Sequence, residues 1–475
     1  MATAYENEKY VSKRETLIYG ISNGGQVFGY SLLTSYLMYF YVNVFSIDAK
    51  IISLIFFIGG IWDIINNPLI GVFIDHKNNT IGKLTSMIKK VSPFQAFATT
   101  LIFMGPVFIK DTSDRSLIKI VYFLVTYFLW EFLYSITDVS FGGLVAVISP
   151  NPIERQRAIS ASNICMQLAT SLVFVAVPIM LDISRSEKTN VSLVTVFAVM
   201  GLLAGIVGVG LFSLSGFFVK ERIHQTKAKQ SVKELLSSVI RNKPLLLLLL
   251  SNLITSFAGI GQAFSTYYYL DVLGYASLSI IVEAVGFVVL LFSYSLIKTA
   301  KKYFNNKKLI VFSNLAVAAV RLTVFFIGLK FYADIKVMVP LLILSNCLVG
   351  LFVGIINVIP TEMLTEAADY AEWKTGIRTE GIAFSLKNSV VKVYGTLAQG
   401  VAAFLLSVIG YVSATSGEAV TQTTEVQKRI WILFSLIPAI MGALSTVPLM
   451  FYNIVDDERN AMLDSLKNMR ENENS

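Results

Sequence analysis

The chain alternates long apolar stretches with short polar connections along nearly all of its 475 residues. About 20 consecutive apolar residues are enough to cross a bilayer as a helix. Stretches of that kind, with loose boundaries, lie near residues 17–44, 51–74, 91–109, 120–147, 158–181, 192–218, 244–270, 277–297, 309–329, 337–360, 380–412 and 430–453. The pattern predicts an all-α integral membrane protein with about twelve transmembrane helices.

The longest polar connection, from Lys220 to Lys243, divides these stretches into two sets of six. We therefore expect a six-helix bundle over residues 1–220, a cytoplasmic middle loop over 221–243, and a second bundle with a short cytoplasmic tail over 244–475. Transporters built from two related bundles hold their substrate near the middle of the membrane, between the bundles. No polar stretch is long enough for a nucleotide-binding domain, and no nucleophile–base arrangement or phosphate-binding loop is present, so the sequence predicts neither an ATP-driven pump nor an enzyme.

Composition supports a membrane protein, with 55% hydrophobic residues, 15% charged residues and a mean hydropathy of +0.65. The first apolar stretch is longer than the core of a cleaved signal peptide, so we expect it to be retained. The net charge of +8 comes from Lys and Arg in the connections, mostly on the side of the termini. By the positive-inside rule, this bias indicates a multi-pass cell-membrane protein with both termini in the cytoplasm, and we expect no nucleic-acid partner.

The second stretch carries an aspartate where the bilayer would make an ionised group costly. Asp63 follows the apolar run Ile51–Ile61, and a charge at such a depth costs a few kcal/mol. On a helix, Asn66 and Asn67 lie three and four residues further along the same face. A carboxylate and two amide oxygens could form half of a site for a small cation or a proton. The alternative is a carboxylate that only joins helices through hydrogen bonds.

The fourth stretch carries a polar stripe, because Glu131, Tyr134, Ser135 and Asp138 follow the i, i+3, i+4, i+7 pattern of one helix face. Such a stripe must face protein or water rather than lipid. Carboxylates accept hydrogen bonds from sugar hydroxyls, and aromatic rings cover the apolar faces of a pyranose, so Tyr134 and Asp138 suit a sugar. The alternative is a hydrogen-bonded seam between helices.

The eleventh stretch contains two lysines. Lys392 is flanked by valines and requires an acidic partner, which we expect among the acids of the first half. Lys387 can extend towards one end of its helix. Glu283 and Arg321 lie in neighbouring stretches of the second half, where we expect a structural pair and assign no function.

Small residues predict close helix packing at Gly24, Gly25, Gly350 and Gly354.

Four segments together resemble the glycoside-pentoside-hexuronide:cation symporter family of the major facilitator superfamily. They occur in the family's order and span essentially the whole chain. The stretch that begins at Asp369 is the most family-specific. The segments are Trp62-Asp63-Ile64-Ile65-Asn66-Asn67-Pro68, Tyr134-Ser135-Ile136-Thr137-Asp138-Val139, Asn242-Lys243-Pro244-Leu245-Leu246 with Asn252, and Asp369-Tyr370-Ala371-Glu372-Trp373-Lys374-Thr375-Gly376 with Glu380-Gly381. The resemblance implies a major facilitator fold and uptake of sugars or glycosides driven by sodium, lithium or protons.

The resemblance also implies roles for individual residues. Cation binding is implied for Asp63, Asn66 and Ser135, with Asn67 at the position of a second family aspartate. Substrate binding is implied for Tyr134, Asp138, Asn163 and Asn252, and for Lys392, which matches the lysine that links the sugar and cation sites.

The chain departs from the family's best-known pattern at four positions. Asn67 and Val27 stand where that pattern has aspartates, Gly142 where it has tryptophan and Asn163 where it has arginine. Neither the ion nor the sugar therefore follows from the resemblance. With one carboxylate instead of two, the cation site offsets less of the charge of a sodium ion, because its other ligands are neutral oxygens. This gives a proton a slight preference over sodium as the coupling ion.

The sequence thus predicts a cation-coupled secondary transporter for a glycoside or other carbohydrate. We expect it to work as a monomer among membrane lipids, with H⁺ or Na⁺ as coupling ion and no further cofactor. The alternatives are an uncoupled sugar facilitator or exchanger, and a lysolipid or amphiphile carrier on the same fold, since fold does not fix substrate.

Overall fold

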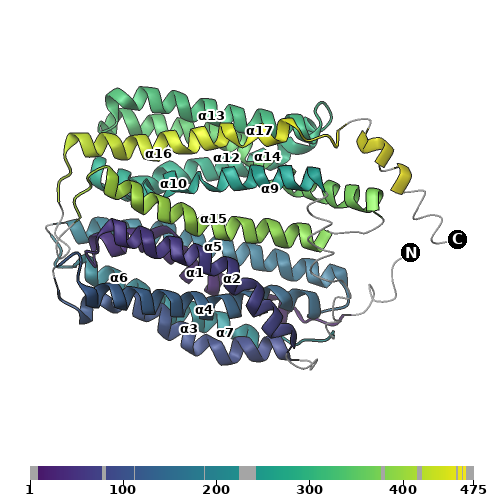
Figure 1. The fold of residues 1–475 in the computed structure, drawn as a ribbon, viewed down its shortest axis with the longest axis horizontal. Helices are drawn as coiled ribbons and strands as arrows, with labels where there is room; N and C mark the ends of the chain where they lie inside the picture. The colour runs from purple at the N-terminus through teal and green to yellow at the C-terminus, as the bar shows by residue number, and fades with distance from the viewer. Residues whose placement is uncertain are drawn as a thin grey trace. The chain divides into compact units, whose positions relative to one another are not determined.

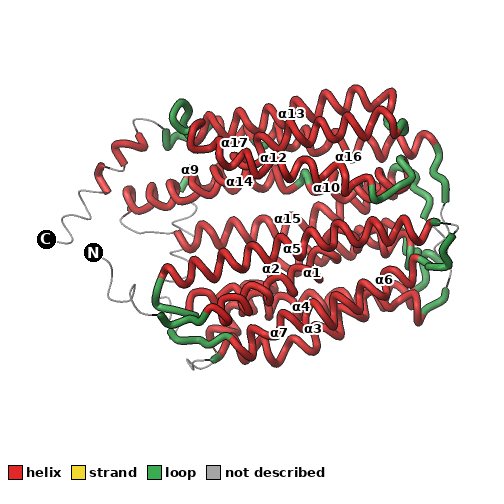
Figure 2. The backbone as a smooth tube through the Cα atoms, turned by 180° about the vertical axis from the view of Figure 1, so that it is seen from behind, coloured by secondary structure: helices red, strands yellow, loops and turns green. Residues whose placement is uncertain are grey.

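The computed structural model describes residues 9–76, 82–111, 113–186, 188–223, 242–375, 380–413, 420–455, 458–462 and 464–466. The described part of the chain is helical and contains no strand (Figures 1 and 2). Nine helices or helical runs in this part are long and apolar enough to cross a membrane: Lys83–Phe108, Leu117–Val147, Ile153–Arg185, Leu193–Phe218, Lys243–Val272, Leu278–Ala300, Asn306–Phe331, Ile335–Lys374 and Thr424–Met450. The expected all-α membrane class is confirmed.

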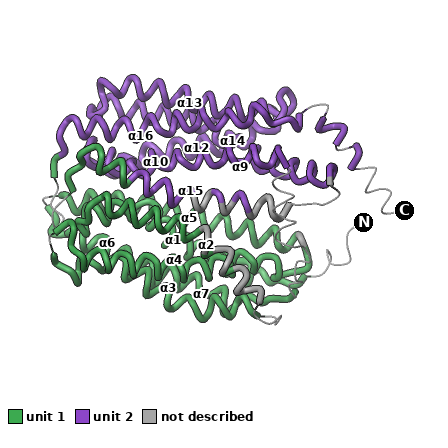
Figure 3. The backbone as a smooth tube through the Cα atoms, in the orientation of Figure 1, with its two compact units in different colours: residues 1–228, 403–421 green, residues 229–402, 422–475 purple. Residues whose placement is uncertain are grey.

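The chain divides into two compact units, residues 1–228 with 403–421 and residues 229–402 with 422–475 (Figure 3). The helices of unit 1 are α1 (Lys13–Asn43), α2 (Ala49–His76), α3 (Lys83–Phe108), α4 (Leu117–Val147), α5 (Pro152–Arg185), α6 (Leu193–Leu202), the π-helix η2 (Leu203–Gly208) and α7 (Val209–Phe218). Those of unit 2 are α9 (Lys243–Ser256), α10 (Gly259–Ala263), α11 (Ser265–Tyr267), the π-helix η3 (Tyr268–Val272), α12 (Leu278–Ala300), α13 (Asn306–Phe331), α14 (Ile335–Thr375), α15 (Glu380–Val408), α16 (Thr424–Leu444) and α17 (Thr446–Met450). The last residues of α15 belong to unit 1.

In unit 1, α1 packs against α5 and α7, α3 packs against α4 and α7, and α2 packs against α4. Glycines allow the closest approaches. A Cβ atom on Gly24 would lie 3.0 Å from the Cys165 carbonyl oxygen, and one on Gly25 would lie 2.4 Å from the Gly208 carbonyl oxygen. The expected close packing at these two glycines is confirmed.

The N-terminal end of α1 is tied to the end of α7 by a buried carboxylate. Glu15 accepts hydrogen bonds of 2.8 Å from both Nη1 and Nη2 of Arg222 and one of 2.9 Å from the Lys220 backbone N–H. The hydrogen bond with Glu15 raises the pKa of the Arg222 guanidinium. A second carboxylate, Glu154, accepts from the backbone N–H groups of Tyr10 and Val11.

In unit 2, α14 packs against α12 and α13, and α13 also packs against α16. Cβ atoms on Gly350 and Gly354 would lie 2.9 Å from the Gly286 carbonyl oxygen and 2.0 Å from Ser293 Oγ, so close packing is confirmed here as well. Glu283 and Arg321 interact electrostatically, which agrees with the expected structural pair.

One expected boundary is wrong. The apolar pattern places the end of the tenth span at residue 360, but α14 continues to Thr375. Pro360 lies inside this helix without ending it, and the polar residues that follow remain helical. Hydropathy marks the end of the apolar part of a helix, whereas the helix itself ends where backbone hydrogen bonding ends.

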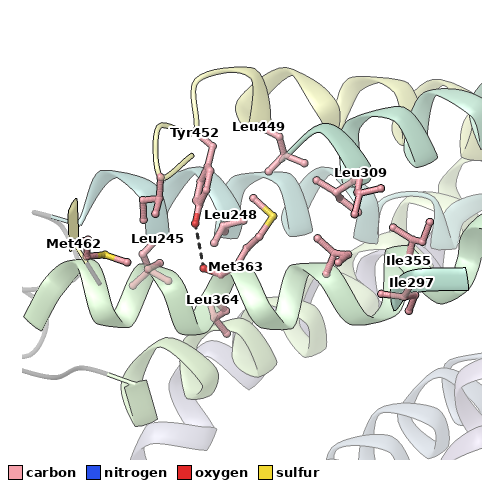
Figure 4. Close-up of a cluster of buried hydrophobic side chains, with 14 of the residues drawn as sticks. Leu245, Leu248, Ile297, Leu309, Ile355, Met363, Leu364, Leu449, Tyr452 and Met462 are labelled. Carbon is pink, nitrogen blue, oxygen red and sulfur yellow. Dashed lines mark hydrogen bonds between the residues drawn. The ribbon is translucent and has the colours of Figure 1, made fainter. Parts of the chain in front are cut away.

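A cluster of buried apolar side chains joins α9, α12, α13, α14 and α17 (Figure 4). Leu245, Leu309 and Leu449 contribute to it from different helices. Tyr452 closes the cluster, and its hydroxyl donates to the Met363 carbonyl oxygen at 3.3 Å. This core fixes one end of unit 2.

We expect Gly25→Ala to lower the stability of the purified protein by about 1–3 kcal/mol, because the added methyl group would overlap the Gly208 carbonyl. The matched control is Gly210→Ala in α7, where nothing lies within 4 Å of the added atom. Alanine favours helix, so the control should be neutral or slightly stabilising. Thermal unfolding in one detergent compares the two variants, and equal melting temperatures would contradict the packing described.

Candidate functional site

The site begins where α2 and α4 approach each other in unit 1. A Cβ atom on Gly59 would lie 2.8 Å from Cε1 of Tyr127, so only glycine fits without displacing the ring. The ring centroids of Phe56 and Tyr127 lie 5.6 Å apart, and those of Trp62 and Phe128 lie 6.2 Å apart. The two helices therefore run parallel, with residue numbers that increase in the same direction. One turn further on, Asp63 of α2 comes level with the polar stripe of α4.

The polar groups of this region are buried. The exposed fraction is 1% for Asp63, 3% for Asn66, 5% for Glu131 and 0% for Ser135. Asp138 is half-buried. The α4 stripe therefore faces the interior of unit 1, as its spacing predicts, and it becomes more accessible at Asp138.

Two buried polar atoms of the site are unsatisfied. Within the part of the chain that the structure describes, neither Asn66 Nδ2 nor Ser135 Oγ has a hydrogen-bond partner. Leaving a buried polar group unsatisfied costs about 1–3 kcal/mol. Such atoms are expected where a ligand or water completes the hydrogen bonding.

Three aromatic rings stack beside the carboxylates. The Tyr134 ring lies 5.0 Å from Trp130 and 5.2 Å from Tyr30, with interplanar angles of 21° and 15°. The Tyr134 phenol interacts electrostatically with the Asp138 carboxylate. Gln26 of α1 donates to Asp138 Oδ1 at 3.3 Å. Asp138 therefore lies at the end of an aromatic stack and accepts a hydrogen bond from α1.

Three carboxylates surround the neighbouring phenols. Asp63, Glu131 and Asp138 all lie close enough to Tyr30 to interact with it electrostatically. Asp63 and Glu131 also interact electrostatically with Tyr127. The region thus concentrates negative charge in a low-dielectric interior, where opposite charge or a proton is favoured.

No group of three or more His, Cys, Asp or Glu side chains in the described ranges is arranged to hold a metal ion. Neutral oxygens next to Asp63 and Glu131 come from Asn66 and Ser135. This donor set suits a proton or a single hard cation with oxygen ligands.

The remaining expected site residues lie on other helices than α2 and α4. Asn163 lies on α5 with an exposed side chain. Asn252 lies on α9 in unit 2, where its Nδ2 donates to the Leu248 carbonyl of its own helix at 3.0 Å. The side chains of Asn67 and Lys392 fall outside the described residues, so the expected acidic partner of Lys392 stays a prediction. Lys387 donates to Thr361 Oγ1 at 3.2 Å.

Sequence reasoning missed Gln26, Tyr30 and Tyr127. Gln26 and Tyr30 lie one turn apart on α1, and the same face carries Asn23, which donates to Ser162 Oγ at 2.7 Å. This polar face on the first span was a usable signal. Tyr127 lies one turn before Glu131 and extends the α4 stripe by i−4.

A family model described as "MFS/sugar transport protein" matches residues 18–456. The chain is 27% identical over 468 residues to the symporter YjmB of Bacillus subtilis, covering 96% of each chain. It is 25% identical to the isoprimeverose transporter of Lactiplantibacillus pentosus, covering 97% of this chain and 92% of the relative. It is 23% identical to a glucuronide carrier protein homologue of Escherichia coli, covering 97% and 96%.

Among solved structures, a D-xylose-proton symporter aligns with a TM-score of 0.61 at 12% identity, covering 93% of this chain and 98% of that one. The nucleoside transporter NupG aligns with a TM-score of 0.60 at 14% identity, covering 93% and 100%. These likenesses establish a common fold. The family model, together with the curated relatives, identifies the chain as a member of the MFS sugar transport family, and within it of the glycoside-pentoside-hexuronide:cation symporters.

Proposed function

We propose that this protein is a secondary active transporter that takes up a glycoside or other carbohydrate together with a cation. The observation that carries the proposal is the acidic cluster of buried Asp63 and Glu131 and half-buried Asp138, which lies beside the stacked rings of Trp130, Tyr134 and Tyr30. The relatives named for isoprimeverose and glucuronide support a carbohydrate substrate.

The aromatic stack and Asp138 form the sugar-binding part of the proposed site. The carboxylate accepts hydrogen bonds from sugar hydroxyls, while the exposed edge or face of a ring covers the C–H groups of the sugar. Asp138 is the accessible member of the acidic cluster, so substrate reaches it first. Asn163, Asn252 and Lys392 are proposed to complete the substrate site, with Lys392 linking it to the cation site.

The cation-binding part consists of Asp63 with Asn66, Asn67 and Ser135. Because Glu131 lies close to the same phenol as Asp63, the two carboxylates repel each other, and binding a cation or proton relieves that repulsion. Sodium prefers several oxygen ligands, whereas a proton needs only one carboxylate. We therefore place H⁺ ahead of Na⁺ as the coupling ion.

At the level of architecture, we propose that α1, α2 and α15 cross the membrane together with the nine helices described above. Helices of 31, 28 and 29 residues rise about 1.5 Å per residue, which exceeds the thickness of a bilayer core. Twelve helices then form bundles over residues 1–220 and 244–475, joined by a cytoplasmic loop over 221–243. Both termini lie in the cytoplasm of a cell-membrane protein that works as a monomer.

Two other functions remain as alternatives on the same fold. An uncoupled sugar facilitator or exchanger would need no cation site, and a lysolipid or amphiphile carrier would need an apolar path for an acyl chain. The buried acids favour coupled carbohydrate transport over both.

The topology predicts that reporter domains fused after Lys229 and after Ser475 lie in the cytoplasm, because Lys and Arg concentrate on that side. Reporters inserted between Ser184 and Ser192 should read external. A fusion series with a cytoplasm-specific and a periplasm-specific reporter measures this. An external reading after Lys229 would contradict the two-bundle arrangement.

We expect Asp138→Asn to weaken substrate binding at least tenfold, because the amide donates where the carboxylate accepted and a charged hydrogen bond is worth about 1.5–3 kcal/mol. Ser140→Ala is the matched control on α4, since among the described residues Ser140 Oγ bonds only the Ile136 carbonyl of its own helix. Isothermal titration with a glycoside panel compares the two folded variants. Normal binding and transport by Asp138→Asn would mean that the cluster is a structural seam.

We expect Asp63→Asn to abolish accumulation of substrate against a gradient while exchange down a gradient persists, because the variant keeps the sugar site but loses the ionisable group. Counterflow and uptake in membrane vesicles separate the two activities. Glu131→Gln is run in parallel, since it removes the neighbouring carboxylate and leaves Asp63. Accumulation at the wild-type level by Asp63→Asn would show that Asp63 does not couple transport to the ion.

A further inference from the structure

The turn between α12 and α13 carries a dense positive charge. Five lysines lie between residues 298 and 308, and this stretch contains no Asp or Glu. The turn joins two helices that are each long and apolar enough to cross a membrane, and only Lys301–Asn305 separate them. A connection this short must lie at the surface of the bilayer.

The lysines at both helix ends lie above apolar faces that are exposed in the protein. On α13, Lys308 shares a helix face with Phe312, Leu315 and Phe326, which are 65%, 42% and 64% exposed. On α12, Lys298 shares a face with Tyr294, Leu291 and Phe287, which are 42%, 56% and 47% exposed. Such faces suit contact with lipid chains, so both lysines lie where headgroups begin.

Aromatic side chains occupy the turn itself. Tyr303 is 77% exposed and Phe304 is 55% exposed, and both follow directly after Lys302. Aromatic rings concentrate at the membrane–water interface, where they contact the headgroup region.

The other two lysines hold the turn in place. Lys301 forms an ion pair with Glu362 of α14. Lys307 donates to the carbonyl oxygens of Met450 and Tyr452 at 2.7 and 2.9 Å, so it satisfies the C-terminal end of α17.

The apolar cluster of Figure 4 includes Ile297, Leu309 and Leu449, which lie beside these lysines in sequence or contact. The exposed lysines therefore project from a packed platform rather than from a long loop.

We propose that Lys298, Lys302 and Lys308 form a binding surface for the headgroup of an anionic phospholipid, with Tyr303 and Phe304 in the interfacial layer. The surface charge is positive, its neighbours on both helices are exposed apolar side chains, and its place at the bilayer surface gives lipid phosphates direct access. Basic residues at this position attract anionic lipids over zwitterionic ones. The proposal does not depend on the transport function or on the site in unit 1.

The test measures lipid binding to the purified full-length protein by native mass spectrometry, with phosphatidylglycerol titrated against phosphatidylcholine. Each exposed lysine should contribute about fivefold, so Lys302→Gln with Lys308→Gln should weaken phosphatidylglycerol binding about 25-fold and leave phosphatidylcholine unchanged. The double variant Lys330→Gln with Lys336→Gln, at the end of α13 and the start of α14, is the matched control and should bind normally. The double variant Lys302→Arg with Lys308→Arg keeps the positive charge and should bind phosphatidylglycerol like the wild type. This result would show that the glutamine variant loses binding through lost charge and not through misfolding.

Equal binding of phosphatidylglycerol by the wild type and the Lys302/Lys308 glutamine variant would overturn the proposal, and so would an equal loss in the Lys330/Lys336 control. Inorganic phosphate at matched ionic strength should not displace the lipid. Displacement would mean that the lysines bind free phosphate instead.

Discussion

The cost of holding carboxylates inside an apolar helical unit is the constraint on which the candidate site depends. Asp63 and Glu131 are almost fully buried, and an ionised group in such surroundings is unstable unless hydrogen bonds or opposite charge compensate it. Tyr127 lies beside both of these carboxylates, and Gln26 of α1 donates a hydrogen bond to the third, Asp138. A cation or a proton bound beside these groups would offset their charge.

Close helix packing creates this arrangement. Gly59 lets Tyr127 lie against the backbone of α2, and the contact fixes the level at which the two polar faces meet. Gly25 similarly allows α1 to pack closely against η2. This packing keeps Gln26 and Tyr30 next to α4. Small residues at such contacts matter in a membrane because association there relies on van der Waals packing rather than on the hydrophobic effect.

The membrane class, the buried stripe of α4 and the close packing at glycines follow from the sequence, because residue periodicity and hydropathy encode them directly. Gln26 and Tyr30 share a polar face of the first span with Asn23, which is a sequence signal, but only the structure shows that Gln26 and Tyr30 contact α4. The end of α14 was misplaced because hydropathy falls at Pro360 while helical hydrogen bonding continues. Stacking of Trp130, Tyr134 and Tyr30 depends on side-chain rotamers in two helices, which no pattern in one sequence specifies.

The most direct test of cation-coupled carbohydrate uptake is accumulation of labelled glycosides by vesicles that contain the wild-type protein. A proton gradient alone, a sodium gradient alone and no gradient are compared. We expect accumulation above the external concentration under the proton gradient, and we expect it to be lost when that gradient is collapsed. Equilibration of substrate without accumulation under either gradient would contradict coupling, and strong accumulation under sodium alone would contradict the choice of ion.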